Sequence, residues 1–356
     1  MPNRKCDIMR VFYFMSILLF VFLFSACETE ETPIEQHAET YRNPVLSPVF
    51  ADPTIIRAED GYFYAYATED FFTHDTGVRY VAIFRSANLV DWEDMGDAFT
   101  TKPSWKAGSS YIWAPDIQYF NGQYYLYYSL SVWHDPNPAI GVATSQHPAG
   151  PFEDQGMLFD SVGIGVPNSI DPFVYLDDTH DEKWLFWGSW HGIWAIRLSA
   201  DGLRVEGEKV QVAGGLFEAA YVINRNGYYY LFVSTGHCCD GANSTYELKV
   251  GRSTGLLGPY VNRMGQNLLH NDGSLVVGDG DRYIGNGHNA IIQDDAGDDW
   301  LVYHGIDRLN PHLPNGATRR PMMLDKIIWT ADGWPQLRNF KPSESAVAVP
   351  YIEEEN

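Results

Sequence analysis

The sequence is poor in basic residues. Its 356 residues include 24 Lys and Arg against 46 Asp and Glu, which gives a formal net charge of -22 at neutral pH. No basic run occurs after residue 10. Proteins bind nucleic acid with clustered lysine and arginine, so this charge balance argues against a nucleic-acid partner. The 22 Tyr, 19 Phe and 11 Trp residues instead offer flat faces that suit a neutral, sugar-like ligand.

Cysteine is also scarce, with four residues in the whole chain. Cys6 and Cys27 lie near the N-terminus, which leaves only the adjacent pair Cys238 and Cys239. A framework of several disulfides is therefore excluded, and two neighbouring cysteines without a second pair at ligand spacing make a poor zinc site. Outside the cytoplasm this pair can form a vicinal disulfide that constrains one loop.

Long segments with helical periodicity are lacking as well. The chain instead repeats one short, aromatic-rich and β-prone pattern, which predicts strands. The pattern occurs at residues 64–67, 125–128, 184–187, 230–233 and 300–303. Most copies follow a turn signal of Asp, Asn and Gly, so each copy reads as the second strand of a hairpin.

Further short strands are predicted between these copies, at residues 78–85, 139–144, 193–198 and 246–251. Groups of about four short strands, one group per blade, are typical of β-propellers. A β-sandwich is the alternative, but five long repeats are difficult to place in one sandwich. We therefore predict an all-β fold with a single domain, a five-bladed β-propeller over residues 41–345. Residues 346–356 are predicted to be a C-terminal tail.

The one long apolar run lies at the N-terminus. Residues 11–24 follow the basic residues Arg4, Lys5 and Arg10, and the run is too short for a comfortable bilayer span. This arrangement predicts a signal peptide over residues 1–26. It ends in Ser25-Ala26-Cys27, which is similar to a bacterial lipobox and predicts lipidation of Cys27.

Plain secretion with cleavage near residue 26 is the alternative. Residues 27–40 are predicted to be an acidic, flexible tether. We accordingly expect an exported bacterial lipoprotein, anchored to the outer membrane on its cell-surface or periplasmic side and attached by lipid alone.

A polar residue with apolar neighbours precedes each of the five hairpins. These residues lie 12, 9, 13, 12 and 12 positions before the aromatic strands, and they are Asp52, Asp116, Asp171, Glu218 and His288. Equivalent positions of successive blades are related by rotation about the propeller axis, so innermost strands would bring all five to one central pocket. Each one taken singly can be an ordinary turn residue. Gathering four acids shifts their pKa values, and this cost favours a functional site.

Carboxyl groups gathered in a pocket suit glycoside hydrolysis. One carboxylic acid protonates the leaving oxygen and a second carboxylate activates water, at a separation of roughly 6.5–9.5 Å in inverting enzymes. A third carboxylate nearby would keep the acid protonated by repulsion of like charges. Calcium binding by clustered oxygens with a histidine is the competing use, and the two can coexist.

The motifs around these positions resemble those of glycoside hydrolase family 43. The likeness rests on Ala-Asp-Pro-Thr-Ile at 51–55, Trp-Ala-Pro-Asp at 113–116, Ser-Ile-Asp-Pro at 169–172, Phe-Glu-Ala at 217–219 and Gly-His-Asn at 287–289. The resemblance implies an inverting five-bladed propeller that acts on arabinan, arabinoxylan or xylan. It also implies that Asp52 is the general base, Asp171 the pKa modulator and Glu218 the general acid. Asp116 belongs to a family motif and is carried over as a pocket residue.

Within the family, the segments 238–246 and 250–253 resemble those of arabinan-degrading members. This resemblance implies endo-acting cleavage of α-1,5-linked L-arabinofuranosyl chains, with His288 helping to hold a hydrated calcium ion and with no organic cofactor. Ala51 departs from the pattern, because arabinanases usually have histidine before the base. Exo-acting α-L-arabinofuranosidase or β-xylosidase activity therefore stays open, as does a non-catalytic glycan-binding propeller.

Four residues are predicted to contact the polysaccharide. Trp113 and Trp190 are candidate stacking platforms for sugar rings, although packing within a blade is the alternative for both. Ser189, beside Trp190, and Asp116 complete the expected substrate contacts. We expect the protein to act as a monomer.

Overall fold

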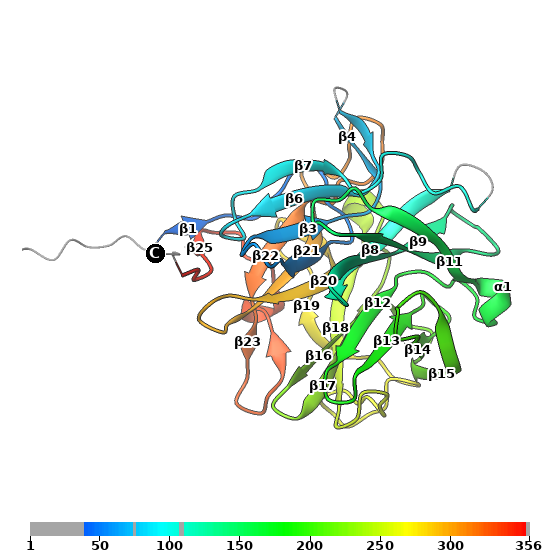
Figure 1. The fold of residues 1–356 in the computed structure, drawn as a ribbon. Helices are drawn as coiled ribbons and strands as arrows, with labels where there is room; N and C mark the ends of the chain where they lie inside the picture. The colour runs from blue at the N-terminus through cyan, green and yellow to red at the C-terminus, as the bar shows by residue number, and fades with distance from the viewer. Residues whose placement is uncertain (1–38, 74–75, 107–109, 354–356) are drawn as a thin grey trace, which may run out of the picture. The chain divides into compact units, whose positions relative to one another are not determined.

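The computed structural model describes residues 39–73, 76–106 and 110–353, drawn in colour in Figure 1. The predicted signal peptide at 1–26, Cys27 and the tether up to residue 38 lie outside these residues. Among the described residues, no helix has the length and apolar character needed to cross a membrane.

Antiparallel strands form five larger sheets in chain order. The first contains β2 (Thr54–Arg57), β3 (Phe63–Tyr66), β6 (Ala82–Ser86) and β7 (Glu93–Asp97). The second contains β8 (Tyr111–Phe120), β9 (Gln123–Ser131), β10 (Ala139–Ser145) and β11 (Glu153–Asp160). The third contains β12 (Phe173–Asp177), β13 (Glu182–Trp187), β14 (Ile193–Leu198) and β15 (Val205–Ala213).

The fourth sheet contains β16 (Glu218–Arg225), β17 (Tyr228–Thr235), β18 (Glu247–Ser253) and β19 (Ser274–Val277). The fifth has β20 (Tyr283–Gln293), β21 (Asp299–Asp307) and β22 (Met322–Lys326). Two short hairpins accompany these sheets. One pairs β4 (Asp70–Thr73) with β5 (Gly77–Arg79), and the other pairs β23 (Ile328–Trp329) with β24 (Pro335–Gln336). Helical segments are limited to α1 (Ser161–Ile164) and two 3-10 turns, at Gly241–Asn243 and Arg338–Phe340, in the described part.

The hydrophobic core consists of five clusters, and each one joins two successive sheets. In the cluster between the first and second sheets, for example, Leu126 and Tyr128 of β9 pack with Tyr66 of β3. Three similar clusters join the second sheet to the third, the third to the fourth, and the fourth to the fifth. The remaining cluster closes the circle, because it packs Phe63 of β3 against Trp300 of β21. The predicted five-bladed β-propeller is therefore confirmed, and the aromatic strands supply its inter-blade packing.

The first strand of each sheet lies at the centre of this circle. β2 contacts β8 and β20, while β12 contacts β8 and β16, and β16 contacts β20. Just before or within each of these strands, one non-glycine residue has a positive φ, between 43° and 58°. The five residues are Asp52, Ala114, Asp171, Ala219 and His288. Backbone held in this uncommon region at equivalent places marks a shared local bend at the centre of the propeller.

One detail differs from the sequence-based prediction, and a second adds to it. The predicted continuous strand 78–85 is wrong, because Val81, with φ 63°, separates β5 from β6. The segment predicted as a tail begins with β25 (Val347–Ala348), which pairs with β1 (Thr40–Tyr41) in the register Thr40 to Ala348. Its described residues are part of the same compact unit as the five sheets.

Candidate active site

A pocket with a volume of about 620 Å³ gathers the side chains from the centre of the propeller. Four of the five predicted central residues line it, namely Asp52, Asp171, Glu218 and His288. The predicted contact residues Trp113, Ser189 and Trp190 line it as well. The lining is completed by Val132, Trp133, His134, Asp135, Asn168, Ile170, Gly236, His237, Cys238, Cys239, Asp240 and Arg320. Convergence of the blades on one pocket is thus confirmed for four of the five positions.

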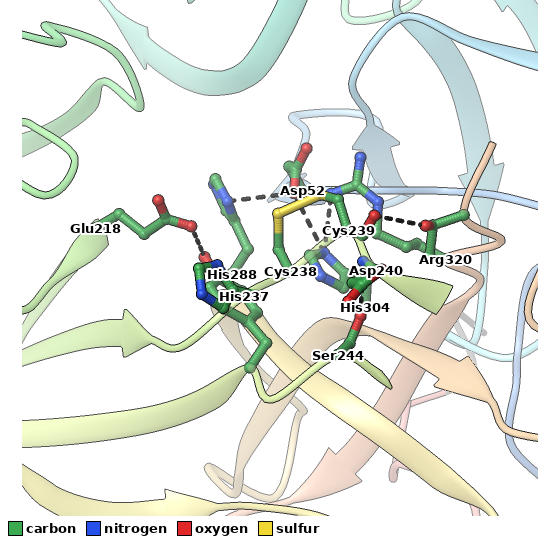
Figure 2. The surroundings of a disulfide bond; sticks show 12 residues. Asp52, Glu218, His237, Cys238, Cys239, Asp240, Ser244, His288, His304 and Arg320 are labelled. Atoms are coloured by element: carbon green, nitrogen blue, oxygen red, sulfur yellow. Dashed lines mark hydrogen bonds and ion pairs between the residues drawn. A yellow bond between two sulfur atoms is a disulfide. The ribbon is translucent and has the colours of Figure 1, made fainter. Parts of the chain in front are cut away.

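Asp52 is surrounded by the guanidinium of Arg320, the hydroxyl of Thr68 and two imidazole rings. Its Oδ1 atom is 2.8 Å from Nη1 of Arg320 and 3.3 Å from Nδ1 of His288, and the hydroxyl of Thr68 donates to Oδ2 at 2.6 Å. The backbone N–H of Asp52 donates to Nδ1 of His304 at 3.2 Å, which fixes the loop ahead of β2. Figure 2 shows the contacts of Asp52 with Arg320, His288 and His304 beside the disulfide.

These contacts decide the charge of Asp52. Burial alone would raise the pKa of its carboxyl group, but the Arg320 guanidinium, together with the neighbouring histidines, holds that pKa well below its usual value. Burial lowers the pKa of His288 to about 4 and also lowers that of His304. At neutral pH the pocket therefore holds an ionised Asp52 beside two neutral imidazoles and one guanidinium.

Glu218 has the opposite electrostatic environment. It begins β16, and its carboxyl oxygens accept hydrogen bonds from Tyr246 at 2.6 Å and from Ser189 at 2.7 Å. Burial raises the pKa of Glu218, the two hydroxyl groups lower it in part, and the negative charge of Asp52 raises it again. In Figure 2 the His288 ring is drawn between the carboxyl groups of Asp52 and Glu218.

Asp171 is the third acid of the pocket. Burial raises its pKa well above the usual value, and the charges of Glu218 and Asp52 raise it further. Its backbone N–H donates to the hydroxyl of Ser129 at 2.9 Å, which ties the third sheet to the second. Like-charge repulsion among the three carboxyl groups favours retention of a proton in the pocket.

Asp116 is not in the pocket, so the prediction that it is a substrate contact is wrong. Its carboxyl group is buried between blades, where it accepts the N–H of Val174 at 2.8 Å and the Gln118 amide at 3.0 Å. The hydroxyl of Thr54 lies 3.4 Å away. The residue with the positive φ in the second blade is Ala114, two positions earlier. Asp116 thus follows the bend instead of occupying it, and its side chain points between the strands.

The predicted contact residues have different surroundings. Ser189 is buried against Glu218, whereas Trp190 is 40% exposed and its ring stacks on that of His237 with centroids 5.9 Å apart. Trp113 lies against Trp133, with ring centroids 5.4 Å apart. Trp133 is 67% exposed, and both Trp113 and Trp133 line the pocket.

Several site residues were missed in the sequence, above all Arg320, Trp133 and the loop histidines His134 and His237. Arg320 lies in the connection between β21 and β22, outside the repeated aromatic hairpins on which the sequence analysis was based. Its positive charge, in a chain with few basic residues, was the one signal that could have pointed to a partner for the acids. Trp133 lies in the loop between β9 and β10, and only its aromatic type hinted at a sugar contact.

The residues around His288 fit an ion that is surrounded mainly by water. Calcium prefers six to eight oxygen ligands, and the described residues contain no group of three His, Cys, Asp or Glu side chains that could hold a metal. His288 is neutral and offers a ring nitrogen. Near it in β20 and β21, the side-chain amide of Asn289, Oδ1 of Asn286 and Nε2 of His304 are buried without a protein partner. Such buried polar atoms are usually satisfied by ordered water.

The arrangement can carry out hydrolysis by general acid and base. An ionised carboxylate accepts a proton from water, and a buried carboxylic acid with a raised pKa donates one to a leaving group. Both functions need separate carboxyl groups with pKa values shifted in opposite directions, as for Asp52 and Glu218.

Comparison with known proteins places the chain among carbohydrate-active enzymes. The model of glycosyl hydrolases family 43 matches residues 41–335. An extracellular endo-α-(1→5)-L-arabinanase of Bacillus subtilis is 34% identical over 298 residues, covering 80% of this chain and 86% of that protein. An extracellular exo-α-(1→5)-L-arabinofuranosidase of Cellvibrio japonicus is 32% identical over 314 residues, covering 80% of this chain and 85% of that protein.

A solved structure shows the same fold. The α-L-arabinanase of Cellvibrio cellulosa, complexed with arabinohexaose, superimposes with a TM-score of 0.72 at 30% identity, covering 82% of this chain and 96% of that one. The region matched by the family model, residues 41–335, contains all five blades. With its propeller fold, its pocket of buried acids and its match to the family model, the chain belongs to glycosyl hydrolases family 43.

Proposed function

We propose that the protein is an inverting endo-arabinanase that hydrolyses α-1,5-linked L-arabinofuranosyl chains. The observation that carries this proposal is the pair of oppositely shifted carboxyl groups, Asp52 and Glu218, in one pocket with Asp171. The substrate class is supported by the relatives, which include an endo-arabinanase and a structure holding arabinohexaose.

In this mechanism Asp52 is the general base. Its ionised carboxylate accepts a proton from a water molecule, which attacks the anomeric carbon from the face opposite the leaving group. Arg320 and Thr68 hold the carboxylate in place. The Thr68 hydroxyl also accepts the N–H of Ala114 at 2.8 Å, so the first two blades fix its orientation together.

Glu218 is the general acid. Its proton passes to the glycosidic oxygen as the bond to the anomeric carbon breaks, and Glu218 is left as a carboxylate that solvent reprotonates. Tyr246 and Ser189 stabilise this carboxylate with two hydrogen bonds. The charge of Glu218 raises the pKa of Asp171, so ionisation of one of these two carboxyl groups opposes ionisation of the other, and this coupling is the proposed role of Asp171 as a pKa modulator.

The aromatic surfaces of Trp113, Trp133 and Trp190 suit the apolar faces of successive sugar rings. The second candidate is exo action on the same linkage. It is favoured by the loop segment 132–135, which forms part of the pocket wall and can narrow it, and by the exo-acting relative.

The product profile on linear α-1,5-arabinan distinguishes these candidates. A ladder of arabino-oligosaccharides at early times would support endo action, and free arabinose from the start would support exo action. The variants D52N and E218Q should lose turnover, while D281N, a matched change at an exposed surface aspartate, should retain it. Turnover by D52N or E218Q at the wild-type rate would contradict the assigned roles, and absence of turnover by the wild-type chain would favour a glycan-binding propeller.

We also propose that a hydrated calcium ion is held near His288. The support is its neutral imidazole and the unpartnered polar atoms of Asn286, Asn289 and His304. A bound cation would supply positive charge in a pocket crowded with acids. Calcium titration of the metal-free chain by calorimetry, with H288A as the control variant, tests this. Equal calcium affinity in both chains would contradict the role of His288.

For the cellular location, we propose export, lipidation of Cys27 and anchoring to the outer membrane. The support is the sequence pattern at residues 1–27 alone. A radiolabelled fatty acid should be incorporated into the full chain in a bacterial host and not into the C27S variant. Labelling of C27S, or none in either chain, would overturn this proposal in favour of plain secretion.

A further inference from the structure

The adjacent cysteines form a disulfide at the wall of the pocket. Cys238 and Cys239 are bonded to each other, both are half-buried, and both line the cavity that holds the three acids. They lie in the loop between β17 and β18. Figure 2 shows the disulfide with Asp52, Arg320 and His237 around it. The mechanism above uses neither sulfur atom.

Hydrogen bonds hold this loop in place from both sides. Within the loop, the N–H of Thr245 donates to the carbonyl of His237 at 3.1 Å. Across to the next connection, the hydroxyl of Thr318 donates to the carbonyl of Cys239 at 2.9 Å, and the N–H of Gly241 donates to Thr318 Oγ1 at 3.2 Å. Thr318 is two residues before Arg320, the partner of Asp52. The disulfide is therefore fixed relative to the proposed base.

The chemistry of this wall differs from that of the acids around it. Two bonded sulfur atoms carry no charge and no proton, and they are polarisable in the manner of a thioether. The neighbouring rings of His237 and Trp190 stack on each other, which adds aromatic surface to this wall. A furanose ring has an equally apolar side formed by its C–H groups.

We propose that the Cys238–Cys239 disulfide is a substrate-contacting surface that binds the C–H face of an arabinofuranosyl ring. The inference rests on the proposed function, because it names a further contact of that same pocket. The bonded pair presents one fixed apolar surface. Two separate thiols would gain rotational freedom and would each add a polar S–H group.

Reduction therefore tests the proposal without changing a residue. Dithiothreitol transfers two electrons and two protons to the disulfide, so the S–S bond breaks, two thiols form and the reagent becomes a cyclic disulfide. We expect the KM of the full chain for arabinohexaose to rise on the order of tenfold. The kcat should change little, because a contact made equally in the ground and transition states affects KM. Reoxidation should restore the original KM.

Two variants serve as controls. The C6S/C27S chain, in which the other cysteines are replaced, should respond to dithiothreitol as the wild type does. The C238S/C239S chain should show the raised KM without reductant and should not respond to it. Mass spectrometry after iodoacetamide treatment counts the thiols, and thermal melting reports the fold.

An unchanged KM in a wild-type chain alkylated at both Cys238 and Cys239 would overturn the proposal. So would a parallel fall of kcat and melting temperature, which indicates a purely structural bond. If the reductant fails to open the disulfide, C238S/C239S decides, and a wild-type KM in that variant counts against the contact. Absence of turnover in both redox states would instead refute the proposed function, and the inference with it.

Discussion

Arg320 Nη1 lies 2.8 Å from Oδ1 of Asp52, although the two residues are 268 positions apart in the chain. Both side chains are 11% exposed, so the ion pair is nearly shielded from solvent. The last blade thereby supplies the cation that keeps the carboxylate of the first blade ionised. Closure of the propeller and ionisation of the proposed base depend on the same contact.

Replacement of Arg320 by Gln should move the acid limb of the pH profile. Without the guanidinium, the effect of burial dominates and the pKa of Asp52 rises. The base is active when ionised, so kcat/KM should begin to fall at a higher pH than in the wild type. Breaking this buried pair should also lower the free energy of unfolding by roughly 3–5 kcal/mol.

The matched control is R320K, which keeps the positive charge and loses the planar guanidinium. Its acid limb should lie between those of the wild type and R320Q. The measurement is kcat/KM on arabinohexaose across acidic pH, together with urea unfolding. An acid limb at the same pH in wild type and R320Q would contradict the role of this ion pair.

The two proposed catalytic acids should respond differently to the leaving group. E218Q cannot protonate the leaving oxygen, and its turnover of arabinan should fall by roughly 10²–10⁴. With a 2,4-dinitrophenyl arabino-oligoside the loss should be far smaller, because this leaving group departs without protonation. D52N should lose a similar factor on both substrates, since activation of water is needed for each. Equal losses for E218Q on both substrates would argue that Glu218 is not the acid.

Repetition made the fold and most of the central site predictable from the sequence. Each aromatic strand is preceded by a central residue. In four of the five blades this residue lies 12 or 13 positions before the strand, and these four residues line the pocket. Asp116 precedes its strand by only 9 positions, and this mismatch was the signal that it lies past the bend. Its family motif was a weaker guide than its spacing.

Contacts outside the repeats were not predictable in the same way. Arg320, Trp133 and His237 lie in the connections between the second and third strands of their blades, and these connections differ in length and sequence from blade to blade. Their positions depend on how long loops fold back across the pocket, which strand periodicity does not encode. The ionisation of the acids was likewise hidden, because it depends on burial and on partners distant in sequence.

Asp116 should make stability depend on pH. Burial raises the pKa of its carboxyl group from 3.8 to about 7, so between these values the folded chain binds a proton that the unfolded chain has released. The contribution of this group to the free energy of unfolding is fully present below pH 3.8. It is lost as the pH rises to about 7, at up to about 1.4 kcal/mol per pH unit. D116N cannot titrate, so its stability relative to the wild type should improve over this window.

Urea unfolding of both chains from pH 4 to pH 8 measures this difference. D116A is a useful companion, because it leaves the N–H of Val174 without its acceptor and should be about 1–3 kcal/mol less stable than D116N at every pH. A constant difference between wild type and D116N across the range would show that Asp116 stays ionised in the folded chain.

Tyr246 tunes the acid in the opposite direction from burial. Burial raises the pKa of Glu218, and the hydrogen bond from Tyr246 at 2.6 Å lowers it by stabilising the carboxylate. In Y246F the pKa of Glu218 should therefore rise. The protonated form is the active acid, so the alkaline limb of the kcat profile should move to higher pH.

Glu218 with a raised pKa is also a weaker acid, so kcat at the pH optimum should fall. The fall should be smaller than the roughly 10²–10⁴ expected for loss of the acid itself. S189A removes the second donor and should shift the limb the same way. A limb that moves to lower pH in either variant would show that these hydroxyl groups favour the protonated form of Glu218, and would reverse the assignment of their role.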